Sequence, residues 1–165
     1  MKRLLLISFT LVFLSGAADN TAGRDKHNNR LNEYKNTLEI VEEGNFLFEA
    51  LRAFPVGGSP VYLTSNYGFI EISDNTGEAG LPFFGRIYNI RDGRAGNIKF
   101  TGEMENLNVS KNPDKLRIRY SFEVRDDDNY KVIMDIGYNG DAMVSILTNN
   151  RSHISYQGDI SRTEK

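Results

Sequence analysis

The alternation of apolar and polar residues between Lys115 and Ile160 restricts the fold of this chain more than any other feature. In its first part, Lys115–Arg125, apolar side chains occupy every second position: Leu116, Ile118, Tyr120, Phe122 and Val124. Side chains of a β-strand point alternately to its two faces. The run therefore predicts a strand with one buried face and one wet face.

Two more alternating stretches follow, and turn residues separate them. The polar residues Asp126–Asn129 precede the first stretch, Asn139-Gly140 ends it, and Asn149-Asn150 interrupts the second. Asn-Gly tolerates the positive backbone angles of a two-residue hairpin, which makes it a strong hairpin signal. The inward positions are then Tyr130, Val132, Met134, Ile136, Tyr138, Ala142, Val144, Ile146, Ile154, Tyr156 and Ile160. The C-terminal third thus predicts an antiparallel meander.

A helix is predicted ahead of the sheet. From Arg30 onward, apolar residues recur at spacings of three and four, at Leu31, Tyr34, Leu38 and Val41. This spacing is typical of one helix face, and Gly44 is a natural helix stop. The next run, Phe46–Phe54, alternates as a strand does, and Pro55 disfavours helical geometry just before it.

Short segments separated by turn residues fill the middle of the chain. Strands are predicted at Val61–Ser65, Tyr67–Ser73, Arg86–Ile90, Ile98–Gly102 and Leu107–Val109. Short strands with hairpin-length connections are typical of a barrel or a sandwich. We therefore predict a mainly β fold, in which an N-terminal α-helix precedes an antiparallel meander sheet. The sheet is expected to curl into a barrel-like shell, lipocalin-like or sandwich.

The N-terminal residues have the pattern of an export signal. Lys2 and Arg3 are followed by the apolar stretch Leu4–Leu14 and then by small residues. This order predicts a signal peptide over residues 1–17 with cleavage near Ala17. A flexible leader over residues 18–29 and a single β-rich domain over residues 30–165 would follow. The apolar stretch is too short for a bilayer, which takes about 20 residues, so we expect no transmembrane anchor.

The amino-acid composition excludes several kinds of site and partner. The chain has no cysteine, which excludes disulfides, thiolate metal sites and a lipid-anchor cysteine. Its formal net charge is −2 without a basic stripe, which gives no support for nucleic-acid binding. Asp126–Asn129 lacks the ligand spacing of a calcium-binding loop, and its adjacent acidic residues indicate a solvent-exposed turn. We expect no metal ion and no cofactor, and a periplasmic or secreted location.

Several segments, in their order along the chain, resemble one protein family. They are Phe46–Ala50, Leu81–Arg86, Gly96–Phe100, Asn139-Gly140 and Ile154–Gly158. The chain is similar in these to small exported proteins found mainly in Bacteroidota, a domain of unknown function of the DUF 4251 type. The resemblance spans about Asn45 to Ile160 and implies a periplasmic or secreted address. It implies no activity and assigns no functional residue.

The segment Gly80–Arg86 is the least strand-like apolar run. Two adjacent phenylalanines cannot both face inward from a regular strand. They suggest a ligand site at the mouth of the barrel, with five candidate residues: Leu81, Phe83, Phe84, Arg86 and Tyr88. In the alternative, the phenylalanines plug the barrel end against the Leu31–Val41 helix.

A second candidate surface is a basic strip on the wet face of two neighbouring strands. It consists of Arg117, Arg119, Arg125 and Lys131, interrupted by Glu123 and Asp135. The strip could receive an anionic glycan or the acids of a protein partner. In the alternative, it forms cross-strand ion pairs.

Catalysis has little support. His153 and Ser155 share a wet face, but no orienting acid or oxyanion hole is recognisable. We predict a non-catalytic exported protein that binds a small apolar ligand or a cell-envelope partner. The alternatives are a hydrolase directed at glycans or the envelope, and an interaction module without a pocket that pairs with another chain by strand addition.

Overall fold

The computed structural model describes residues 21–88 and 96–163, so the predicted signal peptide lies outside the described residues. One helix and ten strands follow in chain order within the described parts: α1 (Thr21–Glu43), β1 (Asn45–Pro55), β2 (Val61–Tyr62), β3 (Phe69–Ser73), β4 (Thr76–Pro82), β5 (Asn97–Glu103), β6 (Glu105–Asn112), β7 (Arg117–Arg125), β8 (Asn129–Ile136), β9 (Asp141–Leu147) and β10 (Ile154–Arg162). This is the predicted helix followed by short strands.

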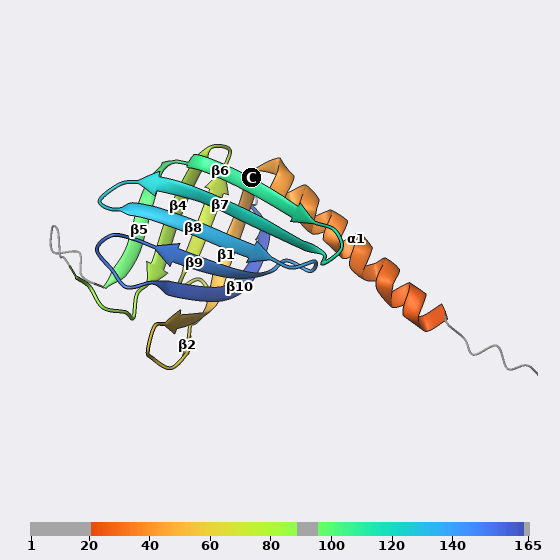
Figure 1. Ribbon diagram of the computed structural model, residues 1–165, viewed down its shortest axis with the longest axis horizontal. Helices are drawn as coiled ribbons and strands as arrows, with labels where there is room; N and C mark the ends of the chain where they lie inside the picture. The colour runs from red at the N-terminus through yellow and green to blue at the C-terminus, as the bar shows by residue number, and fades with distance from the viewer. Residues whose placement is uncertain (1–20, 89–95, 164–165) are drawn as a thin grey trace, which may run out of the picture.

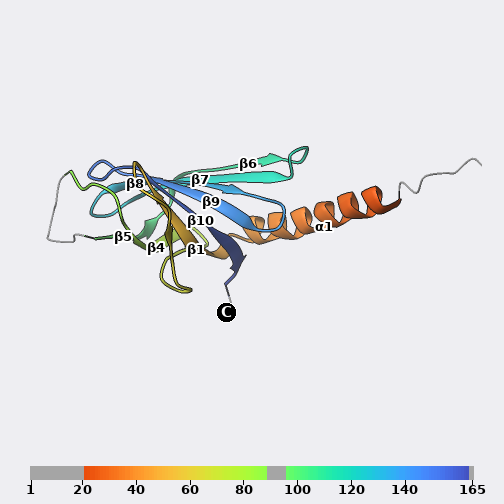
Figure 2. The ribbon, with the colours of Figure 1, turned by 90° about the horizontal axis from the view of Figure 1, so that it is seen from below.

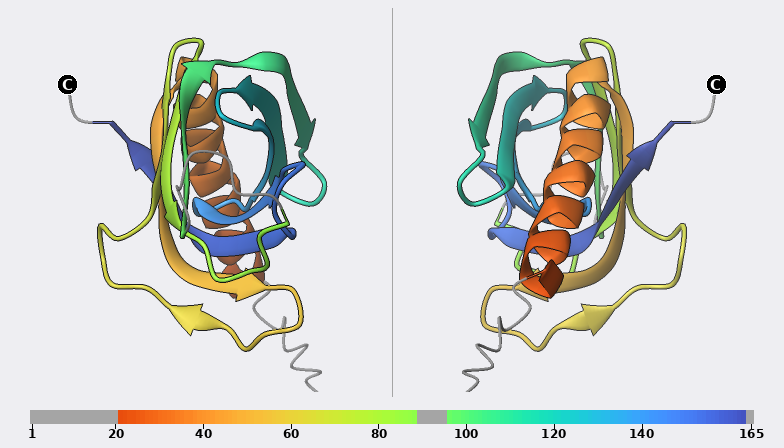
Figure 3. Two further views of the ribbon diagram at one scale, coloured as in Figure 1. Left: turned by 90° about the vertical axis from the view of Figure 1, so that its left-hand side faces the viewer. Right: turned by 90° about the vertical axis from the view of Figure 1, so that its right-hand side faces the viewer.

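The strands form one antiparallel sheet that is nearly closed into a barrel (Figures 1 and 3). Its order is β5-β4-β3-β1-β10-β9-β8-β7-β6, and β2 pairs only with β1. Most neighbours are consecutive hairpin strands, whereas β1 lies between β3 and β10 and so joins the two halves of the chain. The edge strands β5 and β6 meet at a corner around Met104, whose N–H donates to the carbonyl of Asn75 at 2.8 Å. The predicted barrel-like meander is confirmed.

The register is the predicted one. Tyr120 and Ile136 are fully buried, whereas Arg119 lies on the outer face. Aromatic rings from different parts of the sheet meet inside: Phe100 lies 4.9 Å from Tyr130, and Phe46 lies 5.4 Å from Tyr120, between ring centroids. Such contacts bury large apolar areas and fix the packing of the interior. The barrel interior is therefore a side-chain core.

Helix α1 covers one end of the barrel with its C-terminal half (Figure 3, right). Tyr34, Thr37 and Val41 are buried, and the Thr37 hydroxyl donates to the carbonyl of Tyr138 at 2.8 Å. The helix begins at Thr21, so residues 21–29, which the sequence placed in a flexible leader, are helical. They project beyond the barrel (Figure 2). The side chains of residues 23–29 are exposed. Extending a helix whose C-terminal half is already packed costs little, because each added residue gains one hydrogen bond.

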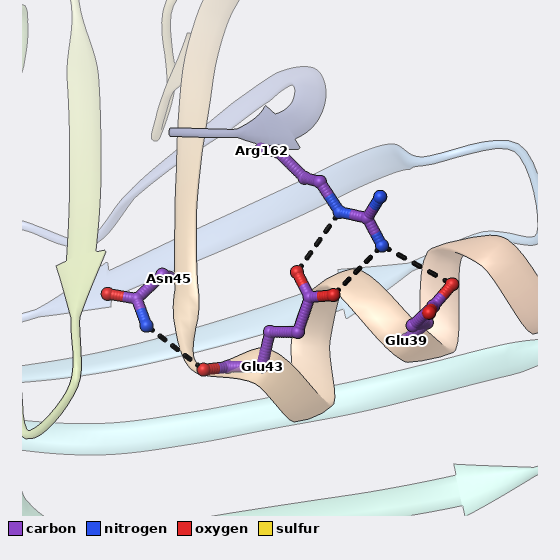
Figure 4. Close-up of polar contacts among 4 residues, drawn as sticks. All are labelled: Glu39, Glu43, Asn45 and Arg162. Atoms are coloured by element: carbon purple, nitrogen blue, oxygen red, sulfur yellow. Dashed lines mark hydrogen bonds and ion pairs between the residues drawn. The ribbon is translucent and has the colours of Figure 1, made fainter. Parts of the chain in front are cut away.

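Ion pairs fasten the end of α1 to β10 and to β6, and Figure 4 shows those with β10. Arg162 of β10 donates to both carboxylate oxygens of Glu43 at 3.0 Å and lies 3.3 Å from Glu39. Lys111 of β6 pairs with Glu42. Gly44 then ends the helix with φ +68°, a left-handed angle that glycine adopts without strain. The predicted helix stop is confirmed.

At three loops the structure differs from the local predictions. The strand predicted from Val61 to Ser65 shrinks to Val61–Tyr62. Of the strand predicted over Arg86–Ile90, residues 86–88 are described, and only Ile87 forms a bridge, to Arg151. The turn at Asn139-Gly140 is longer than two residues, because the Gly137 N–H already donates to the carbonyl of Asp141 at 2.7 Å. In each case the chain forms a loop where the prediction had hydrogen-bonded strand pairs.

Candidate functional site

The segment from Leu81 to Tyr88 seals the barrel end opposite α1. Leu81 and Phe83 are buried in the core, whereas Phe84, Arg86 and Tyr88 are exposed. Two of the five candidate ligand residues are therefore part of the core, and the other three lie on the surface. The packing favours a plug, but the plug does not meet the helix as expected, because β4 runs from the α1 end of the barrel to the far end.

Contacts with the β9–β10 loop hold this segment in place. The Arg86 N–H donates to the Ser152 hydroxyl at 2.9 Å, and the Ser152 N–H donates back to the Arg86 carbonyl at 2.8 Å. The Tyr156 hydroxyl donates to the Pro82 carbonyl at 2.8 Å. The buried guanidinium of Arg151 lies 5.4 Å from the Phe83 ring centroid. Sequence reasoning missed this buried arginine, because its turn context carries no signal of burial.

The acidic turn before β8 serves the same barrel end. Asp128 accepts main-chain hydrogen bonds from Asn149 and Asn150 at 3.3 and 3.1 Å, and Asp127 accepts one from the Tyr130 hydroxyl at 2.6 Å. Burial, together with this carboxylate, raises the pKa of Tyr130. Within residues 21–88 and 96–163, no three His, Asp or Glu side chains are placed to hold a metal ion. These acids therefore act as turn acceptors.

The predicted basic strip is largely paired. Arg119 donates to both oxygens of Asp135 at 2.7 and 3.1 Å, and this hydrogen-bonded carboxylate raises the pKa of Arg119. Arg125 pairs with Glu105 at 3.1 Å, and Lys131 with Glu123 at 3.4 Å. Of the four cations, only Arg117 makes no ion pair with another described residue.

The strip supplies one pH-dependent prediction. The Asn106 side chain donates to Glu123 at 3.1 Å, and this bond, followed by one from Lys131, lowers the pKa of Glu123 below 4.5. The contribution of Glu123 to stability is therefore present above pH 4.5 and is lost as the pH falls through the lowered value. Asn106→Gly should raise this pKa towards 4.5, as measured by NMR titration of the carboxyl.

Glycine is the chosen replacement because Asn106 has φ +53°, which glycine adopts freely. Ser110→Gly, at another exposed position of β6, is the control and should leave the Glu123 titration unchanged. An unchanged Glu123 pKa in the Asn106 variant would contradict the assignment.

Cations without an ion-pair partner gather around the β6–β7 turn. Here a cleft of about 570 Å³ separates α1 from the turn, and we call it the helix–turn cleft. Its lining residues are His27, Arg30, Leu31, Pro113, Asp114, Lys115, Leu116 and Tyr138. The Arg30 guanidinium lies 5.5 Å from the Tyr138 ring centroid. Neither Arg30 nor Lys115 pairs with a carboxylate in the described parts of the chain.

The turn presents Leu116 to this cleft in a strained conformation. Leu116 has φ +51°, whereas the sequence predicted it as an inward residue of the strand. A left-handed angle costs a residue with a side chain roughly 1–2 kcal/mol. Hydrogen bonds from Lys115 N–H to the Asn112 side chain and from Leu116 N–H to the Pro113 carbonyl hold the turn. Strain of this kind concentrates at functional sites.

A second cleft, of about 380 Å³, adjoins the first on the outer face of β6 and β7. It is lined by Ser110, Asn112, Lys115, Arg117, Ile118, Arg119 and Asp135, and we call it the outer cleft. Lys115 borders both clefts. Sequence reasoning found Arg117 and Arg119 but missed Arg30 and Lys115, which only the docking of α1 brings together.

The hydrolase alternative gains no support from its candidate pair. His153 Nε2 lies 3.3 Å from the Ser155 hydroxyl, which also contacts the Ser145 hydroxyl at 3.1 Å. The pair lies on the wet face of the sheet, outside both clefts, and no described carboxylate orients His153. A nucleophilic serine needs an oriented base and an oxyanion hole. There is thus no catalytic evidence here.

Comparison with known proteins shows to which family the chain belongs. The model of a domain of unknown function, DUF4251, matches residues 28–160. The chain belongs to the DUF4251 family. A crystal structure of a DUF4251 family protein from Bacteroides eggerthii is similar, with a TM-score of 0.64 and 19% sequence identity over 79% of this chain and 87% of that chain. At this identity the likeness shows the shared fold.

Two negative findings accompany this assignment. A search of curated proteins found no match to this DUF4251 member. In the parts of the chain that the structure describes, no helix has the length and apolar character to cross a membrane.

Proposed function

We propose that this DUF4251 protein is an exported, non-catalytic binding protein that holds a small amphiphilic anion in the helix–turn cleft. The observation that carries the proposal is that Arg30 and Lys115, neither of them ion-paired with a described carboxylate, line one cleft. Apolar side chains line the same cleft, and Asp114 is the one carboxylate in its lining. Export is supported by the basic start, the apolar stretch Leu4–Leu14 and the small residues that follow.

The lining of the cleft matches such a ligand in two ways. Leu31, Leu116 and Tyr138 offer apolar surface, and desolvating it favours an apolar body. Arg30 and Lys115 can donate charge-assisted hydrogen bonds to a carboxylate or sulfonate, which are stronger than bonds between neutral groups. The cleft volume also falls within the range of about 300–1,000 Å³ that small-molecule sites occupy.

Anilinonaphthalene sulfonate tests this site, because the dye joins an apolar ring system to an anionic group and fluoresces when it leaves water. We expect it to bind with one-to-one stoichiometry and to weaken with ionic strength. The double variant Arg30→Ala and Lys115→Ala should bind the dye at least about tenfold more weakly, since two charge-assisted contacts are lost.

The double variant Arg125→Ala and Lys131→Ala is the matched control. It removes the same charge from cations that are already ion-paired, and dye binding should stay unchanged. The neutral analogue phenylnaphthylamine should bind both proteins equally. Equal loss in the two double variants would overturn the proposal, and so would multiple weak dye sites. For export, the mass of the protein recovered from the periplasm or medium should correspond to cleavage near Ala17, and an intact, cytoplasmic chain would refute it.

A further inference from the structure

We propose that the free edge of β6 is a strand-addition site for an extended acidic peptide segment of a partner protein. The two sites share Lys115 at their border, but strand pairing with β6 does not depend on a ligand in the helix–turn cleft. Figure 1 shows β6 at the margin of the sheet, next to β7 alone. An edge strand carries main-chain N–H and C=O groups that point away from its neighbour and can pair with another chain.

The two sheet edges differ in how they are covered. On β5, the Thr101 N–H donates to the Asp126 carboxylate at 3.2 Å, so the turn before β8 occupies part of that edge. Among the described residues, main-chain hydrogen bonds that leave β6 run to β7. The edge of β6 is therefore the one that remains available for pairing.

The side chains of β6 also suit a docking strand. All eight residues of the strand are exposed, including Leu107 and Val109. The bulge at Asn106 interrupts pairing with β7 only near the start, which leaves a regular run from Asn108 to Asn112. An added strand would cover the exposed apolar side chains on one face while its main chain pairs with the edge.

Charge indicates what kind of strand would fit. Ser110 and Asn112 of β6 line the outer cleft with Arg117 and Arg119 of β7. Arg117 makes no ion pair with another described residue, and Lys115 lies at the same end of the hairpin. Alternate side chains of an added strand would project over this cleft. Carboxylates at those positions can reach the long arginine side chains, so acidic residues complement the site.

A fluorescein-labelled peptide of alternating valine and glutamate, with the length of β6, is the probe. We expect it to bind and to slow hydrogen exchange of amides in Glu105–Asn112, while amides of Asn97–Glu103 in β5 exchange as before. Arg117→Glu should weaken binding at least about tenfold. Lys99→Glu makes the same charge change on the exposed face of β5 and should leave binding unchanged.

Two altered peptides separate strand pairing from simple charge attraction. The same peptide with alternate residues N-methylated keeps its charge but cannot pair through its edge, so binding should be lost. A peptide with lysine in place of glutamate should also fail to bind. Equal binding of the N-methylated peptide, or binding without protection of β6, would overturn strand addition. Sedimentation showing a dimer whose β6 amides are already protected would assign the edge to a second copy of this chain and overturn the proposal as well.

Discussion

Replacing Gly158 by alanine is expected to abolish most of the stability of the barrel. A Cβ atom at this position would lie 1.8 Å from the carbonyl oxygen of Glu49 and 2.8 Å from its carbonyl carbon. These are main-chain atoms of β1, next to the bulge between Ala50 and Arg52. Because no side chain can rotate away, β1 and β10 would have to separate. The expected loss is at least about 4 kcal/mol, out of a typical total of about 5–15 kcal/mol for a native protein.

Because β1 pairs with β10, the loss of stability is expected to affect the whole sheet. It joins the helix and the first strands to the C-terminal meander, so a local separation opens the sheet in its middle. Urea unfolding followed by circular dichroism measures the change. Gly102→Ala is the matched control, because the nearest atom to its new Cβ would be a Val124 methyl group at 3.1 Å, which can shift. We expect it to cost under about 1.5 kcal/mol. A Gly158 variant as stable as the Gly102 variant would contradict this explanation.

The part of the fold that sequence predicts well is the part with a strict period of two. Within β7 and within β8 the inward residues alternate without exception, since a slip by one residue would expose the whole apolar set. Period alone does not show where a strand begins. Leu116 continues the alternation, yet it belongs to a turn that the Asn112 side chain closes. The sequence pattern could not show that hydrogen bond.

The candidate site was harder to predict, because it depends on packing between distant segments. Arg119 and Arg117 look alike in the sequence, but Asp135 neutralises one of them by cross-strand pairing. Arg30 and Lys115 are far apart in the chain and meet only because α1 extends beyond the barrel past the β6–β7 turn. No local pattern predicts that extension, since the side chains of residues 23–30 are exposed. The sequence pattern therefore predicts which side chains face solvent, but it does not predict which of the exposed cations are ion-paired.

Raising the pH should unfold the protein steeply between pH 10 and pH 12. Burial raises the pKa of Tyr120 from 10.0 to about 12, and it also raises the pKa values of Tyr130 and Tyr156. In the unfolded chain these phenols ionise near pH 10. The stability that they support is thus complete below pH 10 and is lost as the pH rises towards the folded pKa values. Each tyrosine contributes a slope of about 1.4 kcal/mol per pH unit, roughly 4 kcal/mol for the three together.

Urea unfolding from neutral pH to pH 12 measures this slope, and phenolate absorbance reports the ionisation itself. Tyr120→Phe should reduce the slope by about one proton, or roughly 1.4 kcal/mol per pH unit. Phenylalanine fits there because the only hydrogen bond of the Tyr120 hydroxyl to another described residue is a long one of 3.9 Å to the Met104 sulfur. Tyr62→Phe, at a ring that is 73% exposed, is the control and should leave the slope unchanged. Phenolate absorbance that rises fully before circular dichroism changes would mean that the three phenols ionise inside the folded barrel, and burial would not be what protects them.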